Sequence, residues 1–561
     1  MLKFNVKDID LPIVPVLDEI RRQLSEKNTL IIQAPPGTGK STVVPLALTG
    51  WADQQKIVML EPRRLAAQTI ARRMASLLGE EVGETVGYRI RFDTRVGKKT
   101  RIEVVTEGIL TRILQNDNSL SEYSTVIFDE FHERSIHADL TLALCLDVQQ
   151  ILRPDLRIVI MSATLDLPGL SELLHAPVIS SSGRQFPVEV IYNGENDIRL
   201  LPELTGRTII KAVREKQGDI LVFLPGESEI RKCEDLLKQN QGDFELHVLY
   251  GMLPFRQQQS AILPDPKGRR KVILSTSIAE TSLTIEGVHV VVDSGYTRVP
   301  RFDPRSGLSR LDTVPVSKDS ADQRAGRAGR LGPGTCYRMW TPAMHDQLPD
   351  HRLPEIAEAD LAGLVLELAK WGITNPCQLK WLTPPPKGAY LQASDLLHQL
   401  EALEDGKITG LGKAMHRLPC HPRIAHMLLK AKENGNLPLA TDVASILEER
   451  DPLGREAGID INLRITALRQ QRSRKKMDRK IKNIAQAAAA YRTMTGCRES
   501  NDPVDPYETG LLLVYAYPER IASARPGNNA QFQLSNGSLA MAGREDDLAR
   551  ESWLAVAHLH A

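Results

Sequence analysis

The sequence has few cysteines, and their spacing is irregular. Six cysteines are spread over 561 residues, and no two of them form a C-x-x-C motif. They are Cys145, Cys233, Cys336, Cys377, Cys420 and Cys497. This pattern argues against a disulfide framework and against a zinc site, and it is typical of proteins in a reducing cytosol. We therefore expect a cytoplasmic protein.

The sequence also lacks long hydrophobic runs and an excess of charge of one sign. No apolar run approaches the roughly 20 residues of a membrane span, and the first residues, MLKFNVKDIDLP, have no signal-peptide core. We therefore expect no membrane association. The formal net charge is +1, from 71 basic and 70 acidic residues, so any basic surface that binds nucleic acid must be local.

Short apolar runs alternate with helical patterns up to about residue 348. The runs include TLIIQA, KIVML, TVIFDE, DILVFLP and VHVVVDSG. Such β-branched runs suit strands that are buried on both faces of a parallel sheet, and the alternation implies β-α-β units. Because so long a segment exceeds one such sheet, we predict an α/β fold with two domains, 1–178 and 179–348.

The pattern changes after residue 349. Stretches such as LPEIAEADLAGLVLELAKWG and LPLATDVASILEE predict helices. Near residue 512, the stretches LLLVYAYPERIA and QFQLSNGSLAM indicate a return to short strands, and so a small β domain.

A glycine-rich stretch, APPGTGKS (34–41), lies between a predicted strand and a predicted helix. Gly37 and Gly39 would let backbone amides close around phosphate oxygens, and the following helix N-terminus favours an anion. Lys40 would reach the β- and γ-phosphates, and the Ser41 hydroxyl would bind Mg²⁺. The alternative, a simple turn, is disfavoured by the Lys-Ser pair. The residues predicted to bind nucleotide here are Pro36, Gly37, Thr38, Gly39, Lys40, Ser41 and Thr42.

A second charged motif, VIFDEFHER (126–134), ends a predicted buried strand with adjacent carboxylates. The stretch APPGTGKS fits the spacing of a P-loop, a phosphate-binding loop. Such a site needs a carboxylate at the end of a second strand to hold the metal, and Asp129 would be that carboxylate. Glu130 would orient and deprotonate the attacking water. Ser41, Asp129 and Glu130 are therefore the predicted Mg²⁺ site. The alternative is a surface salt-bridge cluster with Arg134.

The motif QRAGRAGR (323–330) supplies arginines from the second predicted domain. Arg327 and Arg330 would share a helix face, and arginines commonly stabilise the charge that develops on a transferred phosphoryl group. This favours an ATP site between the two domains. A solvated basic helix is the alternative.

These motifs, in their order, resemble superfamily 2 helicases. The set is APPGTGKS, EPRRLAA (61–67), TEG (106–108), DEFHER, SAT (162–164), STSIAETSLTIEGV (275–288) and QRAGRAGR. The long motif STSIAETSLTIEGV and the last motif, QRAGRAGR, resemble the DEAH/DExH RNA helicase branch. Later stretches, LTPPP, ITGLGKAMHRLPCHPRIAHML and YPERIASARPG, resemble one bacterial subgroup whose members continue further, so we expect this chain to stop within its C-terminal region.

The resemblance implies a fold and a set of domains. Two tandem RecA-like parallel-sheet domains would be followed by a winged-helix-like domain (349–405), a helical bundle (406–500) and an incomplete OB-like β domain (501–561).

The resemblance also implies roles for individual residues. Those implied in hydrolysis are Lys40, Asp129, Glu130, His132, Gln323, Arg327 and Arg330. Further nucleotide contacts would be Arg73 and Glu286. Those implied in coupling hydrolysis to strand movement are Ser162, Ala163 and Thr164. Those implied in contacting the nucleic-acid backbone are Arg63, Arg64, Thr106 and Thr281. Arg91 is a further predicted contact, because GYRIRFD (87–93) combines arginines with aromatics.

A basic stretch, RITALRQQRSRKKMDRKIK (464–482), holds nine Lys or Arg residues and one Asp. Such a helix could line a channel for a nucleic-acid strand, because phosphate contacts give sequence-independent affinity. We predict contacts from Arg472, Lys475 and Lys476. The alternative is a solvated basic face.

Together, these features and the resemblance predict a monomeric helicase that hydrolyses ATP with Mg²⁺ and acts on single-stranded RNA or on an RNA duplex with a single-stranded overhang. The resemblance implies movement from 3′ to 5′. DNA is a possible substrate. Ile262 lies where related helicases often carry an aromatic that stacks on adenine, so other NTPs are candidate substrates. The rival hypotheses are a P-loop NTPase that remodels protein or ribonucleoprotein, and a nucleic-acid-binding scaffold with an inactive ATP site.

Overall fold

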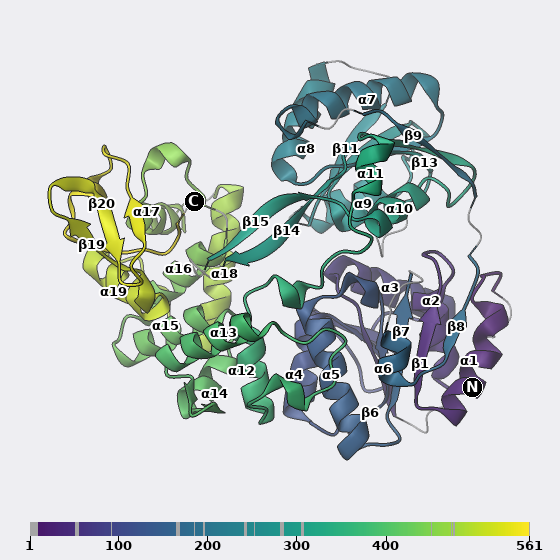
Figure 1. The fold of residues 1–561 in the computed structure, drawn as a ribbon, viewed down its shortest axis with the longest axis horizontal. Helices are drawn as coiled ribbons and strands as arrows, with labels where there is room; N and C mark the ends of the chain where they lie inside the picture. The colour runs from purple at the N-terminus through teal and green to yellow at the C-terminus, as the bar shows by residue number, and fades with distance from the viewer. Residues whose placement is uncertain are drawn as a thin grey trace. The chain divides into compact units, whose positions relative to one another are not determined.

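The computed structural model describes residues 9–50, 55–90, 93–163, 169–183, 186–194, 197–239, 244–251, 253–280, 285–303, 308–449, 451–472, 474 and 477–559. They form two compact units (Figure 1). The first comprises residues up to 301 with 311–359 and 379–384, and the second comprises 302–310, 360–378 and the chain from 385 onward. Within the described ranges, no helix is both long enough and apolar enough to span a bilayer.

The first unit begins with an eight-stranded sheet in which every neighbouring pair is parallel except β3 and β4. Its central strands are apolar and buried on both faces, as parallel strands between helices must be. Across the sheet the strands are β4 (Asp93–Arg95), β3 (Val86–Ile90), β5 (Ile102–Val105), β2 (Lys56–Leu60), β6 (Tyr123–Phe128), β7 (Arg157–Ser162), β1 (Thr29–Gln33) and β8 (Val178–Ser180). The helices of this part are α1 (Leu17–Glu26), α2 (Lys40–Leu48), α3 (Arg64–Leu78), α4 (Glu107–Asn116), α5 (Ile136–Ile151) and α6 (Leu170–Leu174).

A second sheet in the same unit has six strands, all parallel. Across the sheet they are β11 (Glu245–Leu249), β12 (Lys271–Ser275), β10 (Asp219–Phe223), β13 (Val288–Asp293), β16 (Gly334–Arg338) and β9 (Val188–Tyr192). Its helices are α7 (Leu201–Glu215), α8 (Glu227–Gln239), α9 (Phe255–Ile262), α10 (Lys318–Gly326) and α11 (Pro342–Asp346). The two parallel sheets confirm the predicted α/β class.

The changeover between the two sheets falls slightly later than the predicted boundary at residue 178. Strand β8 still pairs with β1 as far as Ser180, and the second sheet begins with Val188. A two-stranded hairpin, β14 (Tyr296–Asp303) and β15 (Leu308–Pro315), follows β13.

The second unit is mainly helical and carries two small antiparallel sheets. One is the hairpin of β17 (Leu403–Glu404) and β18 (Lys407–Ile408), and the other has the order β21 (Leu539–Met541), β20 (Asn528–Leu534), β19 (Ile521–Arg525) and β22 (Trp553–Ala555). The helices are α12 (Ala362–Trp371), α13 (Lys387–Gln399), α14 (Gly410–His416), α15 (Pro422–Glu433), α16 (Leu437–Glu448), α17 (Ile461–Arg472), α18 (Arg479–Thr495) and α19 (Pro506–Ala516).

Helix α19 corrects the expectation of a strand in LLLVYAYPERIA. The Asp505 side chain accepts a hydrogen bond from the Tyr507 amide, and Pro506 occupies the first turn, which together start a helix. Leu512 and Leu513 then pack into the apolar core of the helical region. The small β sheet therefore begins only after α19.

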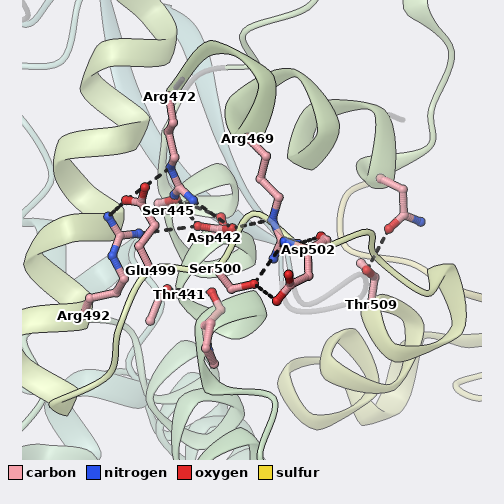
Figure 2. Close-up of polar contacts among 12 residues, drawn as sticks. Thr441, Asp442, Ser445, Arg469, Arg472, Arg492, Glu499, Ser500, Asp502 and Thr509 are labelled. Carbon is pink, nitrogen blue, oxygen red and sulfur yellow. Dashed lines mark hydrogen bonds and ion pairs between the residues drawn. The ribbon is translucent and has the colours of Figure 1, made fainter. Parts of the chain in front are cut away.

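The basic stretch 464–482 is not one exposed helix. It divides between α17 and α18. Arg469 and Arg472, both in α17, point toward Asp442 (Figure 2). The Asp442 carboxylate, 1% exposed, accepts from Arg469 at 3.0 Å and from both terminal nitrogens of Arg472, whose side chain is 4% exposed. Arg492 lies 3.6 Å from the same carboxylate. Arg472 is thus a buried structural residue, which corrects its expected contact with nucleic acid.

We expect Asp442→Asn to destabilise the second unit. The substitution removes the charge that three arginines share, and a buried ion pair that loses one partner typically costs about 3–5 kcal/mol. Thermal and urea unfolding would measure the loss. Arg474→Ala, at an exposed position in the same basic stretch, is the matched control and should change stability by less than about 0.5 kcal/mol. Equal unfolding of both variants and the parent would contradict this assignment.

Candidate functional site

The P-loop joins β1 to α2 at the carboxyl edge of the first sheet. Gly37 and Gly39 adopt left-handed backbone angles, with φ of +88° and +94°. At Gly39 an added Cβ would also lie 2.8 Å from Leu11 Cδ1, so that side chain would have to shift. The chain can therefore turn tightly here only with glycine, and the turn places Lys40 at the start of α2.

Lys40 and Glu130 form a buried ion pair. Their Nζ and Oε1 atoms are 3.1 Å apart, and each side chain is 3% exposed. Glu130 has a left-handed φ of +48°, which a non-glycine residue adopts only at a cost. The strained backbone turns the carboxylate of Glu130, just beyond the end of β6, toward the P-loop.

Asp129 provides oxygens suited to a divalent cation. Its Oδ1 accepts the Glu130 amide at 2.9 Å, and Ser41 is near enough to lower the pKa of its carboxyl group. Its Oδ2 is buried without a hydrogen-bond partner among the described residues. Burial and the Glu130 charge raise the pKa of Asp129 to about 7. A hard cation beside these oxygens would remove both penalties, so the residues fit Mg²⁺.

Glu130 itself remains ionised. Burial alone would raise its pKa, but Lys40, His132 and Arg327 favour the charged form and hold the pKa low, at about 2. A carboxylate that is charged at neutral pH can accept a proton from water once its partner Lys40 is engaged elsewhere.

A third carboxyl group, Glu61, lies in the same cluster and was missed by sequence reasoning. It is fully buried, and burial with the charges of Asp129 and Glu130 raises its pKa well above the usual range. Its position at the start of EPRRLAA was the available signal, because this segment follows strand β2, the neighbour of β6.

The arginines of QRAGRAGR divide into two kinds. Arg324 is structural: it is 1% exposed and pairs with Asp293 at 2.8 Å and Glu280 at 2.9 Å. Arg327 donates through Nε to the Glu280 carbonyl at 3.0 Å. Burial lowers the pKa of Arg327 and of Arg330, the latter to about 10, and the Arg330 charge lowers that of Arg327 further. An anion bound between them would be strongly favoured.

His132 connects the acidic motif to the SAT motif. Its Nδ1 lies 3.4 Å from Glu130 Oε2 and 3.5 Å from the Ala163 amide nitrogen. One ring nitrogen cannot donate to the carboxylate and accept from the amide at once. The contacts of His132 Nδ1 with Glu130 and with Ala163 therefore exclude each other. Phe131 is buried, and its ring packs edge-on against that of Phe128.

The remaining predicted residues are distributed more widely. Gln323, Ser162 and Thr106 are at least partly buried, Ser162 at the end of β7 and Thr106 just before α4. Arg64, Arg73 and Glu286 are exposed. Arg63 contacts other protein groups, described below. Five predicted residues lie outside the described ranges: Arg91, Thr164, Thr281, Lys475 and Lys476.

Known proteins share this arrangement. Residues 16–173 match the DEAD/DEAH box helicase family, and residues 201–332 match the helicase conserved C-terminal domain. Crystal structures of Escherichia coli HrpB, one titled a DEAH/RHA helicase and one a DExH-box NTPase, superpose with TM-scores of 0.85 and 0.82 at 43% identity. Each alignment covers 97% of this chain. This chain in turn spans 68% of the HrpB chain in the first structure and 66% of that in the second. This chain belongs to the DEAH/DExH-box helicase family.

The sequence relatives agree with the structures. The chain is 43% identical over 548 residues to the ATP-dependent RNA helicase HrpB of E. coli, covering 97% of this chain and 65% of that protein. It is 37% identical over 438 residues to the ATP-dependent RNA helicase HrpA of Borreliella burgdorferi. That alignment covers 76% of this chain and 53% of HrpA. The predicted RecA-like domains and the resemblance to a bacterial subgroup, HrpB, are thereby confirmed.

Glu107 is a second carboxyl group that sequence reasoning missed in this DEAH/DExH-box chain. It accepts a hydrogen bond from Ser135, the residue that caps α5 directly after DEFHER. Burial, with the nearby charges of Glu355 and Glu133, raises the pKa of Glu107 to about 8 despite that bond. Within the TEG motif, the sequence predicted a role for Thr106 alone.

We expect Glu107→Gln to stabilise the chain at neutral pH. The folded state keeps the Glu107 proton up to about pH 8, whereas the unfolded state loses it near 4.5, so parent stability falls as pH rises between these values. Glutamine can still accept the hydrogen bond from Ser135, and it has no proton to lose. The variant should therefore gain up to about 3 kcal/mol in free energy of unfolding over the parent at pH 7. Urea unfolding from pH 5 to 9 would test this, with the exposed Glu81→Gln as control. Parallel pH profiles for parent and Glu107→Gln would refute it.

Proposed function

We propose that this chain is an ATP-dependent RNA helicase that hydrolyses ATP with Mg²⁺ where the P-loop meets the arginines of the second parallel domain. The observation that carries the proposal is the buried Lys40–Glu130 pair, with Arg327 close enough to help hold Glu130 ionised. HrpB and HrpA, which carry the name ATP-dependent RNA helicase, support the choice of substrate.

ATP binding would divide the Lys40–Glu130 pair. The β- and γ-phosphates draw Lys40 away, and the P-loop amides and the N-terminus of α2 bind the remaining phosphate oxygens. Ser41 and Asp129 would hold Mg²⁺, which neutralises phosphate charge when bound. Glu130 is left without its cation and can take a proton from water.

Hydrolysis then follows from the same groups. A water oxygen attacks the γ-phosphorus, its proton passes to Glu130, and the bond to the leaving ADP oxygen breaks. Arg327 and Arg330 stabilise the charge that spreads over the γ-phosphoryl oxygens, and Gln323 contacts the same group. His132 transmits the change at Glu130 to Ser162, Ala163 and Thr164, which couple it to strand movement.

The nucleic acid is proposed to be single-stranded RNA, or an RNA duplex with a single-stranded overhang, followed 3′ to 5′ by a monomer in the cytoplasm. DNA is a further candidate substrate. Arg64 and Thr106, with Arg91 and Thr281, would contact its backbone. Because the inward-facing Arg472 is unsuited, we add Arg474, Lys480 and Lys482, exposed residues of the same basic stretch, to Lys475 and Lys476. Ile262 offers no ring to adenine, so other NTPs should also serve.

We expect substitutions at the ion pair to separate binding from turnover. Lys40→Ala should weaken nucleotide binding. Glu130→Gln should bind ATP at least as well as the parent, because Lys40 loses a competing partner, yet lose roughly a hundredfold or more in RNA-stimulated turnover as a base is removed. Nucleotide titration, steady-state hydrolysis and duplex unwinding are the measurements, with exposed Glu122→Gln as control. A parental rate of ATP hydrolysis in Glu130→Gln would contradict the proposal. A parental rate that does not change when RNA is added would favour a protein-remodelling NTPase.

We expect the exposed basic residues to govern RNA affinity. Replacing Arg474, Lys480 and Lys482 with alanine should weaken RNA binding without sequence preference and flatten the salt dependence by about 0.7 slope units per lost phosphate contact. Fluorescence anisotropy over a salt series would measure both. Arg472→Ala is the contrasting variant, since it should lower thermal stability while the folded protein keeps the parental slope. An unchanged slope in the triple variant would leave these residues as a solvated face.

A further inference from the structure

Arg63 connects the two parallel domains of the first unit. It lies between β2 and α3, and its side chain is 23% exposed. Its Nη1 donates to the carbonyls of Ser277 at 3.0 Å and Ile278 at 2.7 Å. Both carbonyls belong to the short 3-10 turn η5 (Ser277–Ala279), which follows strand β12 of the second sheet. At least two of its five N–H groups are therefore used by protein rather than by a phosphate.

The same guanidinium also binds the acidic motif. Its Nη2 is 3.1 Å from Glu133 Oε1, within DEFHER. Two residues further along, Leu65 packs against the same apolar core of the second domain as Ile278. Arg63 thus holds the turn η5 and the hydrolytic motif together by charge and hydrogen bonds, and Leu65 adds an apolar contact at the same place.

The residue after η5 controls the catalytic arginine. Glu280 accepts from Arg327 Nε through its carbonyl at 3.0 Å, and its carboxylate pairs with Arg324 at 2.9 Å. Moving η5 would move Glu280, and moving Glu280 would move Arg327 relative to Glu130. A continuous path therefore runs from Arg63 through η5 and Glu280 to Arg327.

We propose that Arg63 is a positioning residue for hydrolysis, which clamps η5 to the acidic motif so that Arg327 faces the γ-phosphate beside Glu130. The inference rests on the proposed function for the role of Arg327. It differs from the backbone-contact role that resemblance gave Arg63, and it leaves the adjacent, exposed Arg64 as the RNA contact of this motif.

The test measures ATP hydrolysis without RNA and RNA affinity without nucleotide. We expect Arg63→Ala to lower the RNA-free kcat roughly tenfold to a hundredfold, the range for a small misplacement of a catalytic group. ATP affinity and RNA Kd should stay within about threefold of the parent, a difference under 1 kcal/mol. Arg64→Ala should raise the RNA Kd instead. Arg22→Ala is the matched control, an exposed arginine that pairs with Glu19 and Glu26, and should match the parent in every measurement.

Arg63→Lys keeps the positive charge and guards against a folding defect in the alanine variant. One ammonium cannot reproduce the fork that reaches two carbonyls and a carboxylate, so the RNA-free kcat should fall by an intermediate factor. A parental RNA-free kcat in either variant would overturn the clamp, whatever happens to RNA affinity. Absence of hydrolysis in the parent would instead defeat the proposed function itself, so the two failures are distinguishable.

Discussion

The Lys40–Glu130 ion pair is the interaction on which the rest of the site depends. Both side chains are almost fully buried, so neither charge is tolerable without the other or a substitute for it. Glu130 meets Lys40 from a left-handed backbone, and the positive φ angles of Gly37 and Gly39 form the turn that places Lys40 there. The pair also implies a choice of partner, because a phosphate that binds Lys40 must release Glu130.

The same rule of compensated buried charge organises the second parallel domain. Arg324 is buried between Asp293 and Glu280, and this fixes the end of α10, directly before Arg327. Because α10 ends at Gly326, Arg327 and Arg330 lie beyond it and do not share a helix face, which corrects the prediction from the sequence. Burial lowers the pKa values of Arg327 and Arg330. An anion that binds beside them is therefore favoured, because it compensates their buried charges. One arginine of the motif therefore stabilises the fold so that the next two can serve the ligand.

In the helical region of the second unit the rule has a different outcome. Asp442 gathers Arg469, Arg472 and Arg492 from two helices into a buried cluster. Positive residues that look equivalent in the sequence are thus divided between an interior that joins helices and an exposed remainder that can meet phosphate.

The sequence by itself determined the α/β class, the P-loop, the adjacent carboxylates and the arginine motif. These features are local: a glycine turn after an apolar strand, or two carboxylates at a strand end, have few other physical explanations. What only the tertiary structure decided is the partner of each charge. Arg63 faces the second domain, Arg472 faces Asp442, and Glu107 accepts from Ser135. LLLVYAYPERIA begins as a helix that packs on α15 and buries Leu512 and Leu513. A charge or an apolar run acquires its role from groups distant in the chain, and no local pattern contains them.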